Sequence, residues 1–422
     1  MISRVQALGY RCLRYVDLEL GTFHILVGPN ASGKSTFLDV LAVMGDILKD
    51  GPEAATHRRA QSLRELTWKR EANQFQLAVE MRVPESVRGS SSQNGKTYSR
   101  CRYEIEVGVD PEVSGVRLLG ENFFLMTESP PRRETQPMLF PAEPSPPASI
   151  LQKRGVHTPG GWRRVVGLSK EGRSYNFRSE TTDWSFPLRP GVQTQKAALA
   201  MVPEDERFSI SNWARRVLGE GVQVLALNSR AMREPCRPDL PITFRPDGSN
   251  LPLVVENLIR KHPDRFRRWL SHVQTVLPQL SGMEALRREV DLYPYLLVKY
   301  ATGIAVPSWL LSDGTLRLLA LTLLAYLPTE GQVFLIEEPE NGIHPKALEA
   351  VYNSLSSVYE GQVLCATHSP LLLGLGGLSD LLCFALTESG ATDIVKGPEH
   401  PALRAWKGEV ALDTLYAAGV LG

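Results

Sequence analysis

A short loop near the start of the chain has the residue types and spacing that bind phosphate groups. It reads Gly28-Pro29-Asn30-Ala31-Ser32-Gly33-Lys34-Ser35 and continues into Thr36. Gly28 and Gly33 allow the backbone to turn so that its N–H groups face phosphate oxygens. Lys34 would reach the β and γ phosphates of a nucleotide, and the Ser35 hydroxyl would ligate Mg²⁺. The loop therefore predicts a site for a nucleotide and Mg²⁺.

The segments on either side of this loop have the patterns that such a loop requires. The run Phe23 to Val27 is continuously apolar, which is typical of a buried parallel strand. Residues Ser35 to Leu48 repeat apolar side chains at helical spacing. A strand, a glycine-containing loop and a helix are thus predicted in the order that phosphate-binding loops use.

Two adjacent carboxylates roughly 300 residues later follow a second apolar run, Val333 to Ile336. In parallel sheets the carboxyl ends of the strands line the ligand crevice, so we expect Glu337 and Glu338 to lie beside the loop. Glu337 would help to hold Mg²⁺, and Glu338 would orient and deprotonate the attacking water. The alternative is a solvated pair of surface glutamates, but the preceding strand and the following Pro339 favour the catalytic role.

Two further segments have polar residues where an apolar element ends or begins. The run Val363 to Thr367 leads directly into His368, whose ring would donate a hydrogen bond to the γ-phosphate. The alternative for His368 is a structural side chain. Ser312 precedes the apolar segment Leu316 to Leu327 and is a natural helix N-cap. With Gly314 it also forms a γ-phosphate site, although the residues alone leave open whose phosphate it meets.

Composition limits the class of protein. The chain has 422 residues and a net charge of +1, which predicts two or three structural units and argues against a protein that coats polyanions. Its five cysteines are scattered, which favours a reducing cytosol and no zinc site. The start lacks a signal pattern and the segment Leu316 to Leu327 is too short to cross a bilayer. We expect a cytoplasmic protein with no membrane partner.

The chain divides into three expected parts. Residues 1–128 read as strands around one helix, with strand patterns at Tyr15 to Leu20, Gln76 to Val83, Arg102 to Val109 and Val116 to Leu125. Residues 129–289 are an expected insertion, and residues 290–422 return to strong periodicity, with a strand expected over Val290 to Ala301.

The expected insertion begins with a proline-rich stretch, for which we predict an exposed extended loop. Its prolines are Pro130, Pro131, Pro137, Pro141, Pro144, Pro146 and Pro147. Helices are predicted over Glu204 to Leu218 and Leu253 to Leu277, and a short strand over Gln223 to Ala226.

The four motifs together resemble the ABC-type ATPase heads of the RecF, SMC, Rad50 and OLD-like group. The loop reads GPNASGKST, the signature LSDGT, the carboxylate segment FLIEEPENGIHP and the switch histidine ATHSP. The segment from Val5 to Leu20 also resembles the first hairpin of that group. The resemblance covers about 130 residues at the two ends of the chain. It implies an α/β P-loop NTPase fold, with a mixed sheet, an antiparallel β lobe and an inserted α+β or helical region.

The resemblance also implies an arrangement of two heads. Ser312 and Gly314 would contact ATP bound to the opposite protomer, so that a homodimer sandwiches two nucleotides, with higher assembly left open. The segment Asn341 to His344 would cross the dimer interface, and Arg11 would touch the nucleotide phosphates.

Three departures from the group pattern concern individual residues. Glu337 stands where the metal carboxylate is usually Asp, so a longer side chain must fit. The signature has Asp313 and Thr315 where transporters have Gly and Gln, which points away from transporters. The glutamine that usually links the γ-phosphate to the β lobe has no secure counterpart, and Gln61 is a weak candidate.

The spacing of the motifs suggests a biological role. The insertion is longer than in transporter ATPases and lacks the coiled coil of chromosome-type ATPases, as in OLD-like and RecF-like ATPases of anti-phage systems. The ending, with Trp406 to Glu409 and Leu412 to Gly422, also resembles that group. We see no nuclease signature, so the first hypothesis is a hydrolysing, dimerising ATPase switch that controls a partner effector, a nuclease or toxin encoded nearby.

Two other hypotheses stay open at this point. The first is a DNA-clamping ATPase of repair or recombination, for which a group of basic residues supplies a phosphate-binding surface, with an ordinary solvated helix face as the alternative. Its members are Lys261, Arg265, Arg267, Arg268, Arg287 and Arg288. The second treats ATP as a structural ligand, which Glu338 argues against.

Overall fold

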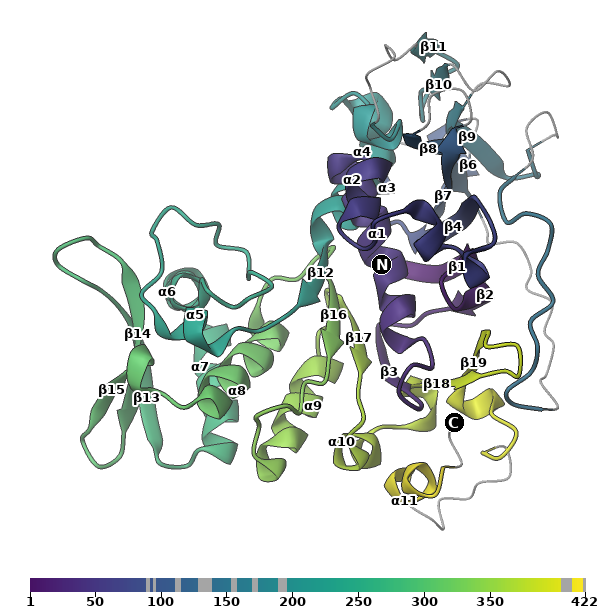
Figure 1. Ribbon diagram of the computed structural model, residues 1–422. Coiled ribbons are helices and arrows are strands. Elements are labelled where there is room, and N and C mark those ends of the chain that lie inside the picture. Colours follow the sequence, from purple (N-terminus) through teal and green to yellow (C-terminus); the bar gives the residue numbers. More distant parts are fainter. Residues whose placement is uncertain are drawn as a thin grey trace.

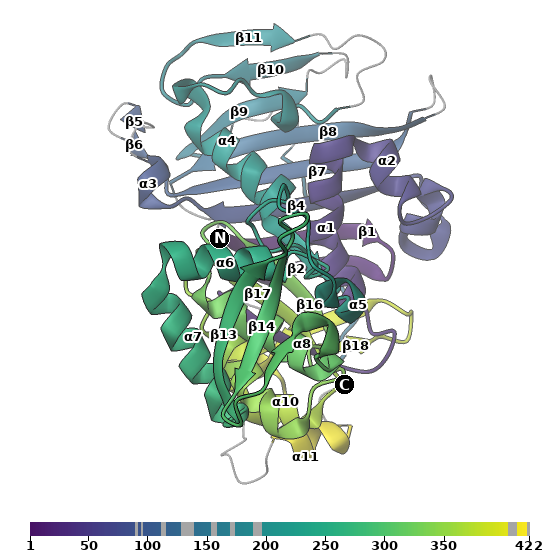
Figure 2. The ribbon, with the colours of Figure 1, turned by 90° about the vertical axis from the view of Figure 1, so that its left-hand side faces the viewer.

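Two large sheets contain most of the strands in the computed structural model (Figure 1). The described residues are 1–88, 92–93, 96–110, 115–127, 139–152, 158–168, 174–188, 196–403 and 412–419. A six-stranded sheet forms the middle of the molecule, and an eight-stranded sheet forms a lobe beside it. A quarter turn of the molecule shows that lobe lying across one end of the six-stranded sheet (Figure 2). The α/β fold with an antiparallel β lobe is thereby confirmed.

The six-stranded sheet has the strand order β12-β16-β17-β3-β18-β19. All neighbours in it are parallel except β18 and β19. The bounds are β3 Phe23–Val27, β12 Val222–Leu225, β16 Val333–Glu337, β17 Gln362–Ala366, β18 Leu381–Leu386 and β19 Thr392–Lys396. Strands β16, β17 and β3 are therefore side by side, although they come from opposite ends of the chain.

The continuous apolar runs of the central strands have a direct physical reason. In β16, Val333 and Leu335 face one hydrophobic cluster, and Phe334 and Ile336 face a second cluster on the other side of the sheet. The same alternation occurs in β17 and β3, so both faces of the sheet are covered. A strand buried on both faces needs apolar side chains at every position.

Helices cover the two faces of this sheet. On the face toward the β lobe, helix α1 (Lys34–Asp50) packs against the turn at Val217–Gly221 and near β17. Helices α8 (Asp313–Leu323) and α9 (Leu348–Ser356) belong to the cluster on the other face. The remaining helices are α2 Pro52–His57, α3 Glu85–Arg88, α4 Ser209–Arg216, α5 Ser229–Arg233, α6 Leu251–Lys261, α7 Pro263–Val276, α10 Pro370–Leu375 and α11 Leu412–Ala417.

The β lobe is one antiparallel sheet with the strand order β11-β10-β9-β8-β7-β4-β1-β2. Its bounds are β1 Ile2–Tyr10, β2 Leu13–Glu19, β4 Gln74–Arg82, β7 Arg100–Asp110, β8 Gly115–Met126, β9 Trp162–Leu168, β10 Tyr175–Arg178 and β11 Ser185–Leu188. The four strands expected in the first part of the chain are therefore confirmed. A short hairpin of β5 Ser92–Gln93 and β6 Lys96–Thr97 lies between β4 and β7 in sequence.

Strands from the middle of the chain join both large sheets. β9, β10 and β11 extend the β lobe, whereas β12 adds an edge to the six-stranded sheet and confirms the short strand expected near Gln223. A third sheet contains β13 Leu280–Arg287, β14 Pro294–Tyr300 and β15 Ala305–Pro307, so its first hairpin crosses the expected boundary at 289/290. The three-part division of the chain stays a prediction.

Three expected elements are wrong in their extent. The helix predicted over Leu253 to Leu277 is two helices, α6 and α7, because Pro263 has no N–H and forces His262 out of helical geometry, at φ −136° and ψ 60°. The segment Glu204 to Leu218 is not one helix either, since α4 lies between a 3₁₀ turn and a π turn. The strand predicted from Val290 begins at Pro294, after an exposed turn.

The described part of the proline-rich stretch, residues 139–152, has no helix or strand, which fits the predicted extended loop. Pro130, Pro131 and Pro137 lie outside the described residues, as do Trp406 to Glu409. At one end the Asp393 carboxylate accepts from Ala142 N at 2.8 Å, and at the other Gln76 Oε1 accepts from Ile150 N at 2.9 Å. These hydrogen bonds hold one end of the segment against β19 and the other end against β4. No helix within the described ranges is long and apolar enough to cross a membrane.

Candidate active site

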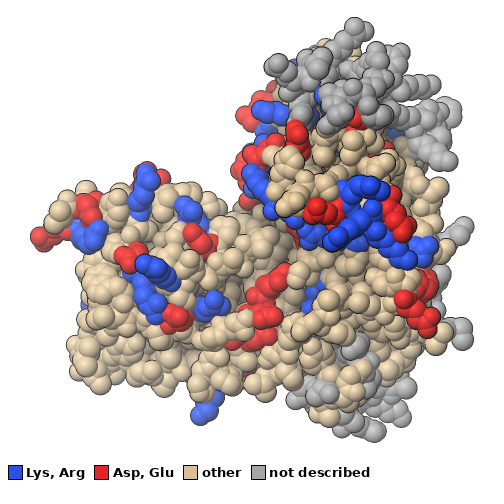
Figure 3. Space-filling view, viewed as in Figure 1, with Lys and Arg blue, Asp and Glu red and all other residues tan. Residues whose placement is uncertain are grey.

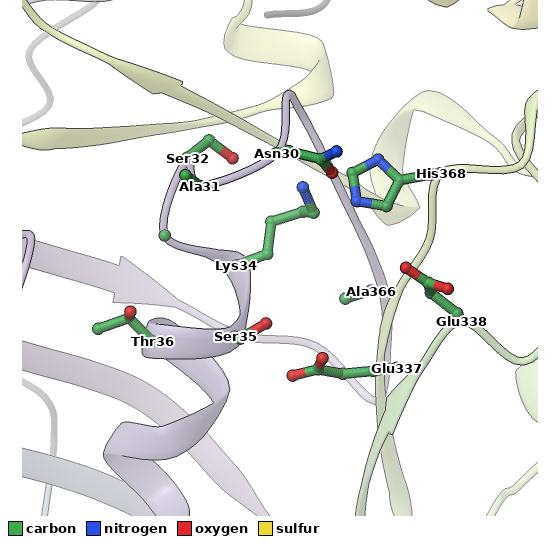
Figure 4. Close-up of a pocket in the computed structure, with 11 residues that line it drawn as sticks. Asn30, Ala31, Ser32, Lys34, Ser35, Thr36, Glu337, Glu338, Ala366 and His368 are labelled. Carbon is green, nitrogen blue, oxygen red and sulfur yellow. The ribbon is translucent and has the colours of Figure 1, made fainter. Parts of the chain in front are cut away.

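Three neighbouring strands deliver the predicted site residues to one place. β3 leads into the phosphate loop, β16 ends at Glu337, and β17 ends two residues before His368. The loop, both glutamates and His368 line one pocket of about 400 Å³ together with Ala366 (Figure 4). The loop residues that line it are Asn30, Ala31, Ser32, Gly33, Lys34, Ser35 and Thr36. The expected meeting of segments roughly 300 residues apart therefore occurs.

The two loop glycines are required by both conformation and space. Gly28 has φ 147°, and a Cβ there would lie 2.2 Å from the backbone oxygen of Phe384. Gly33 has φ 101°, and a Cβ there would lie 2.3 Å from Thr392 Oγ1. Both φ values lie in the range that favours glycine. The loop is consequently seated against β18 and β19, which the sequence pattern did not show.

The Lys34 ammonium lies inside the loop. It donates hydrogen bonds to the backbone oxygens of Gly28 and Pro29, both at 2.8 Å. Burial lowers the pKa of Lys34 to about 8, against the opposing effect of the Glu337 and Glu338 charges. A lysine with this pKa is still mostly charged at neutral pH, so it suits a polyanionic ligand.

Ser35 and Glu337 offer oxygen atoms to the same part of the pocket. Ser35 lies in the first turn of α1, and Glu337 ends β16 with an exposed side chain that points toward Ser35 (Figure 4). Mg²⁺ prefers oxygen ligands and is usually held by one or two protein side chains plus phosphates and water. The oxygen atoms of this pair fit the ligand preference of Mg²⁺, and their role as Mg²⁺ ligands stays a prediction.

Glu338 has an unusual backbone and a defined side-chain partner. Its φ is 47°, a left-handed conformation that a side chain of this kind rarely adopts. Its N–H donates to Ala366 O at 2.8 Å, which ties it to β17. The Asn341 side-chain amide donates to Glu338 Oε2 at 2.5 Å. The carboxylate is thus oriented beside the loop, as a general base requires.

His368 is held through its backbone and its ring. Glu340 Oε1 accepts from the Thr367 hydroxyl at 2.6 Å and from His368 N at 3.2 Å. The ring nitrogen Nδ1 lies 3.2 Å from the Tyr416 hydroxyl. The ring stands beside Asn30 at the mouth of the loop (Figure 4). A hydrogen-bond donor at this position faces the place expected for a γ-phosphate.

The signature segment lies apart from this pocket. Ser312 caps α8, where its hydroxyl accepts from Thr315 N at 3.2 Å, as the N-cap prediction required. Gly314 allows α8 to approach the segment after the glutamates, because a Cβ there would lie 2.6 Å from Gly342 O. Ser312 is exposed and does not line the pocket. Its contact with a nucleotide stays a prediction.

Arg11 and Gln61 also lie outside the pocket lining. The Arg11 guanidinium is 3.4 Å from Asp39 Oδ2, on α1. Gln61 is exposed, and its N–H donates to Glu65 Oε2 at 3.4 Å. The roles suggested for these two residues stay predictions.

Sequence reasoning assigned no role to three residues that support the site. Thr392 donates its hydroxyl to Ser32 O at 2.9 Å, Glu340 anchors the His368 turn, and Tyr416 contacts the His368 ring. Only Glu340 had a signal, since it is a third carboxylate in the segment after β16. Thr392 and Tyr416 come from distant parts of the chain and have no local pattern.

The basic residues suggested for DNA have acidic neighbours. Arg265 pairs with Glu360, Arg287 with Glu256, Arg267 with Asp264 and Arg288 with Asp291. On the face shown in Figure 3, Lys and Arg alternate with Asp and Glu, and acidic side chains gather in the hollow between the two arms. Most of this group therefore fits the ordinary solvated surface, and DNA binding stays a prediction.

Comparison with known proteins gives a partial sequence match. Residues 221–374 match the AAA_21 family, described as "AAA domain, putative AbiEii toxin, Type IV TA system". An "OLD nuclease" from Thermus scotoductus (strain ATCC 700910 / SA-01) is 44% identical over 48 residues, which are 11% of this chain and 9% of that protein. The match thus covers less than a tenth of the length of this relative.

Comparison with solved structures covers nearly the whole chain. An SMC head bound to the C-terminal winged-helix domain of ScpA has a TM-score of 0.50 at 13% identity, over 93% of this chain and 96% of that one. The SMC head domain from Thermotoga maritima has a TM-score of 0.43 at 12% identity, over 94% and 98% of the two chains. An SMC head from Pyrococcus furiosus, bound to the ScpA C-terminal domain, has 0.48 at 11%, over 93% and 95%.

The first of these likenesses concerns the fold, and the family match concerns the part of the chain that contains the signature, both glutamates and His368. The phosphate loop meets both glutamates and His368 in one pocket, which the signature does not line. Together these findings support the resemblance to the RecF/SMC/Rad50/OLD-like group of ABC-type ATPase heads.

Proposed function

We propose that this protein hydrolyses ATP and dimerises around it, and that the ATP-bound dimer controls a partner effector. The observation that carries the proposal is the division of the motifs. The loop, Glu337, Glu338 and His368 line one pocket, whereas Ser312 lies exposed at the start of α8 outside it. A second copy can therefore supply its own signature segment to the nucleotide.

The residues of the pocket have separate roles in the proposed reaction. The loop N–H groups and Lys34 bind the phosphates, and Ser35 with Glu337 would hold Mg²⁺, which neutralises charge on the phosphate oxygens. Glu338, oriented by Asn341, accepts the proton of the attacking water. His368 donates a hydrogen bond to the γ-phosphate and thereby distinguishes ATP from ADP.

The proposed dimer follows from the exposed signature. The first N–H groups of α8 and the Ser312 hydroxyl form a phosphate-binding helix end. Arg233 forms an ion pair with Asp313 and donates to Leu311 O at 3.1 Å, so the segment is held in place before a ligand arrives. Binding between two such heads would depend on ATP, because the γ-phosphate connects the two surfaces.

The proposed control of an effector has weaker support. The matched family is described by a toxin and a toxin–antitoxin system, and the relative matched over 48 residues is named a nuclease. The proposed role in anti-phage defence comes from the resemblance of the four motifs to OLD-like and RecF-like ATPases. The effector would be a separate protein encoded nearby, and ATP hydrolysis would limit how long it is engaged.

The Glu338→Gln variant tests the proposal. It should bind ATP but hydrolyse it at least about 100-fold more slowly, because the general base is removed while hydrogen bonding is kept. The trapped ATP state should elute as a dimer on size exclusion with light scattering. A monomer at saturating ATP would refute the sandwich, and a wild-type rate would refute the role of Glu338.

Two matched variants separate binding from dimerisation. Lys34→Ala should lose nucleotide binding, because the loop loses the cation that it surrounds. Ser312→Arg should bind ATP normally but neither dimerise nor hydrolyse it, since its bulk lies on the exposed signature. A pull-down with the Glu338→Gln protein, compared with Lys34→Ala, would then test for a partner of the ATP state.

A further inference from the structure

The C-terminal helix α11 reaches the histidine of the proposed active site. It lies beside α10, the helix that begins directly after the His368 turn (Figures 1 and 2). Leu412 is buried in the cluster that includes α10, and Leu415 and Tyr416 pack against that cluster. These contacts place the Tyr416 hydroxyl 3.2 Å from His368 Nδ1.

The contact involves one ring nitrogen, and its chemistry determines what the other can do. A neutral imidazole carries its proton on one nitrogen and accepts a hydrogen bond at the other. Burial, helped by the negative charge of Glu340, raises the pKa of Tyr416, so its phenol stays protonated and is able to donate. A phenol that donates to Nδ1 leaves the proton on Nε2, while the ring lines the pocket.

The acidic side chain nearby strengthens this arrangement. Glu340 Oε1 is occupied by the Thr367 hydroxyl and the His368 N–H, so the backbone of the histidine is fixed as well as its ring. The histidine is therefore held at two points, its backbone by a carboxylate from the segment after β16 and its ring by a phenol from α11. Only Tyr416 touches the imidazole nitrogen among the hydrogen bonds described for this ring.

We propose that Tyr416 is a positioning residue that holds His368 as the Nε2–H tautomer, with that N–H directed to the γ-phosphate. The proposal rests on the proposed function for its consequence, because the aligned N–H matters only if ATP binds in the pocket. The C-terminal helix then becomes part of the γ-phosphate sensor. A displacement of α11 would release the ring and weaken the response to ATP without changing the phosphate loop.

The tautomer is measured directly on the full-length, nucleotide-free protein. Histidine labelled with ¹⁵N gives imidazole correlations that tell a protonated nitrogen from an unprotonated one, and the His368 signals are those missing from His368→Gln. We expect a proton on Nε2 and none on Nδ1 in the wild type. Tyr416→Phe, which keeps the ring that packs against α10, should show a mixture of both tautomers.

The rate of hydrolysis supplies the second readout. Tyr416→Phe should lower kcat about 10-fold, the loss expected for one hydrogen bond, and change KM for ATP by less than about 2-fold. Tyr352→Phe is the matched control, because the Tyr352 ring packs against the same hydrophobic cluster as Tyr416. The Tyr352 hydroxyl donates to Asp380 at 3.4 Å and not to His368. This variant should leave both tautomer and kcat unchanged.

Two outcomes would overturn the positioning role. One is a proton on His368 Nδ1 in the wild type, and the other is a Tyr416→Phe protein with the wild-type tautomer. A wild-type protein that fails to hydrolyse ATP would refute the proposed activity instead. Because the tautomer is measured without nucleotide, that failure leaves the test of Tyr416 intact.

Discussion

Glu338 shows how individual residues in this site depart from ordinary preferences. Its left-handed backbone, at φ 47°, directs the chain away from β17 immediately after the sheet and presents the side chain to Asn341. Such a conformation costs about 1–3 kcal/mol and persists only where the surroundings fix it. Here the hydrogen bond from Glu338 N to Ala366 O supplies part of that restraint.

Lys34 gives a prediction about pH at the residue scale. Its pKa of about 8 means that the free protein loses the ammonium charge as pH rises past that value. A polyanion binds the charged form of Lys34, so the affinity for ATP must fall as pH rises. The terminal phosphate of ATP titrates at about pH 6 and is therefore already ionised over this range. We expect the Kd for an ATP analogue to rise at least about 10-fold between pH 7 and pH 9.5.

The control for this prediction is Lys34→Arg. A guanidinium keeps its charge over the whole range, so the affinity of this variant, even if lower, should not vary in the same way. Titration with a fluorescent ATP analogue gives both curves. A wild-type Kd that is flat between the two pH values would contradict the role of the lysine charge.

At the scale of elements, close packing around α1 keeps the phosphate loop in place. Gly45 on α1 faces the π turn at Val217–Gly221, where a Cβ would lie 2.6 Å from Leu218 O. Alanine is favoured over glycine within a helix by about 1 kcal/mol, but overpacking against a fixed backbone atom costs about 1–3 kcal/mol. The unfavourable contact should be the larger effect.

Gly45→Ala should therefore lower the free energy of unfolding by about 1 kcal/mol, as measured by urea denaturation. Gly219→Ala is the control, since no atom lies within 4 Å of the added Cβ. Its stability should equal that of the wild type or exceed it slightly. A Gly45→Ala protein more stable than Gly219→Ala would show that helix propensity, not packing, decides at this position.

For the whole molecule, one buried side chain connects the two large sheets. Gln362 begins β17, and its amide donates to Ile2 O at 2.9 Å and to Gly21 O at 2.6 Å. Its Oε1 accepts from Ile2 N at 3.2 Å, so the residue joins the start of β1 in the β lobe to the central sheet. Gln362 and Ile2 are both buried, which keeps water from the backbone groups of Ile2, whereas Gly21 is exposed.

Gln362→Leu should lower the free energy of unfolding by about 2–5 kcal/mol, because it leaves the buried N–H and carbonyl of Ile2 without the side-chain amide that they contact. Gln61→Leu, at an exposed position, should have little effect. Thermal and urea unfolding of both proteins provide the comparison. Equal stabilities would mean that the junction tolerates the loss through water or rearrangement.

The local residue patterns were enough to predict the candidate site residues and most of the strands and helices beside them. Gly28, Lys34, Ser35, Glu337 and His368 follow or begin strongly patterned strands and helices, and local backbone physics decides those patterns. Prediction from the sequence failed where a single residue interrupts a pattern, as at Pro263. The spacing of apolar residues continues across this proline, although its missing N–H ends the helix.

The distant residues that support the candidate site became visible only in the folded structure. The pairing of β16, β17 and β3 brings the ends of the chain together, and it seats the loop against Thr392 and His368 against Tyr416. The same packing places strands from the middle of the chain in both large sheets. Contacts between residues far apart in sequence depend on how whole faces pack, and no local spacing records that packing.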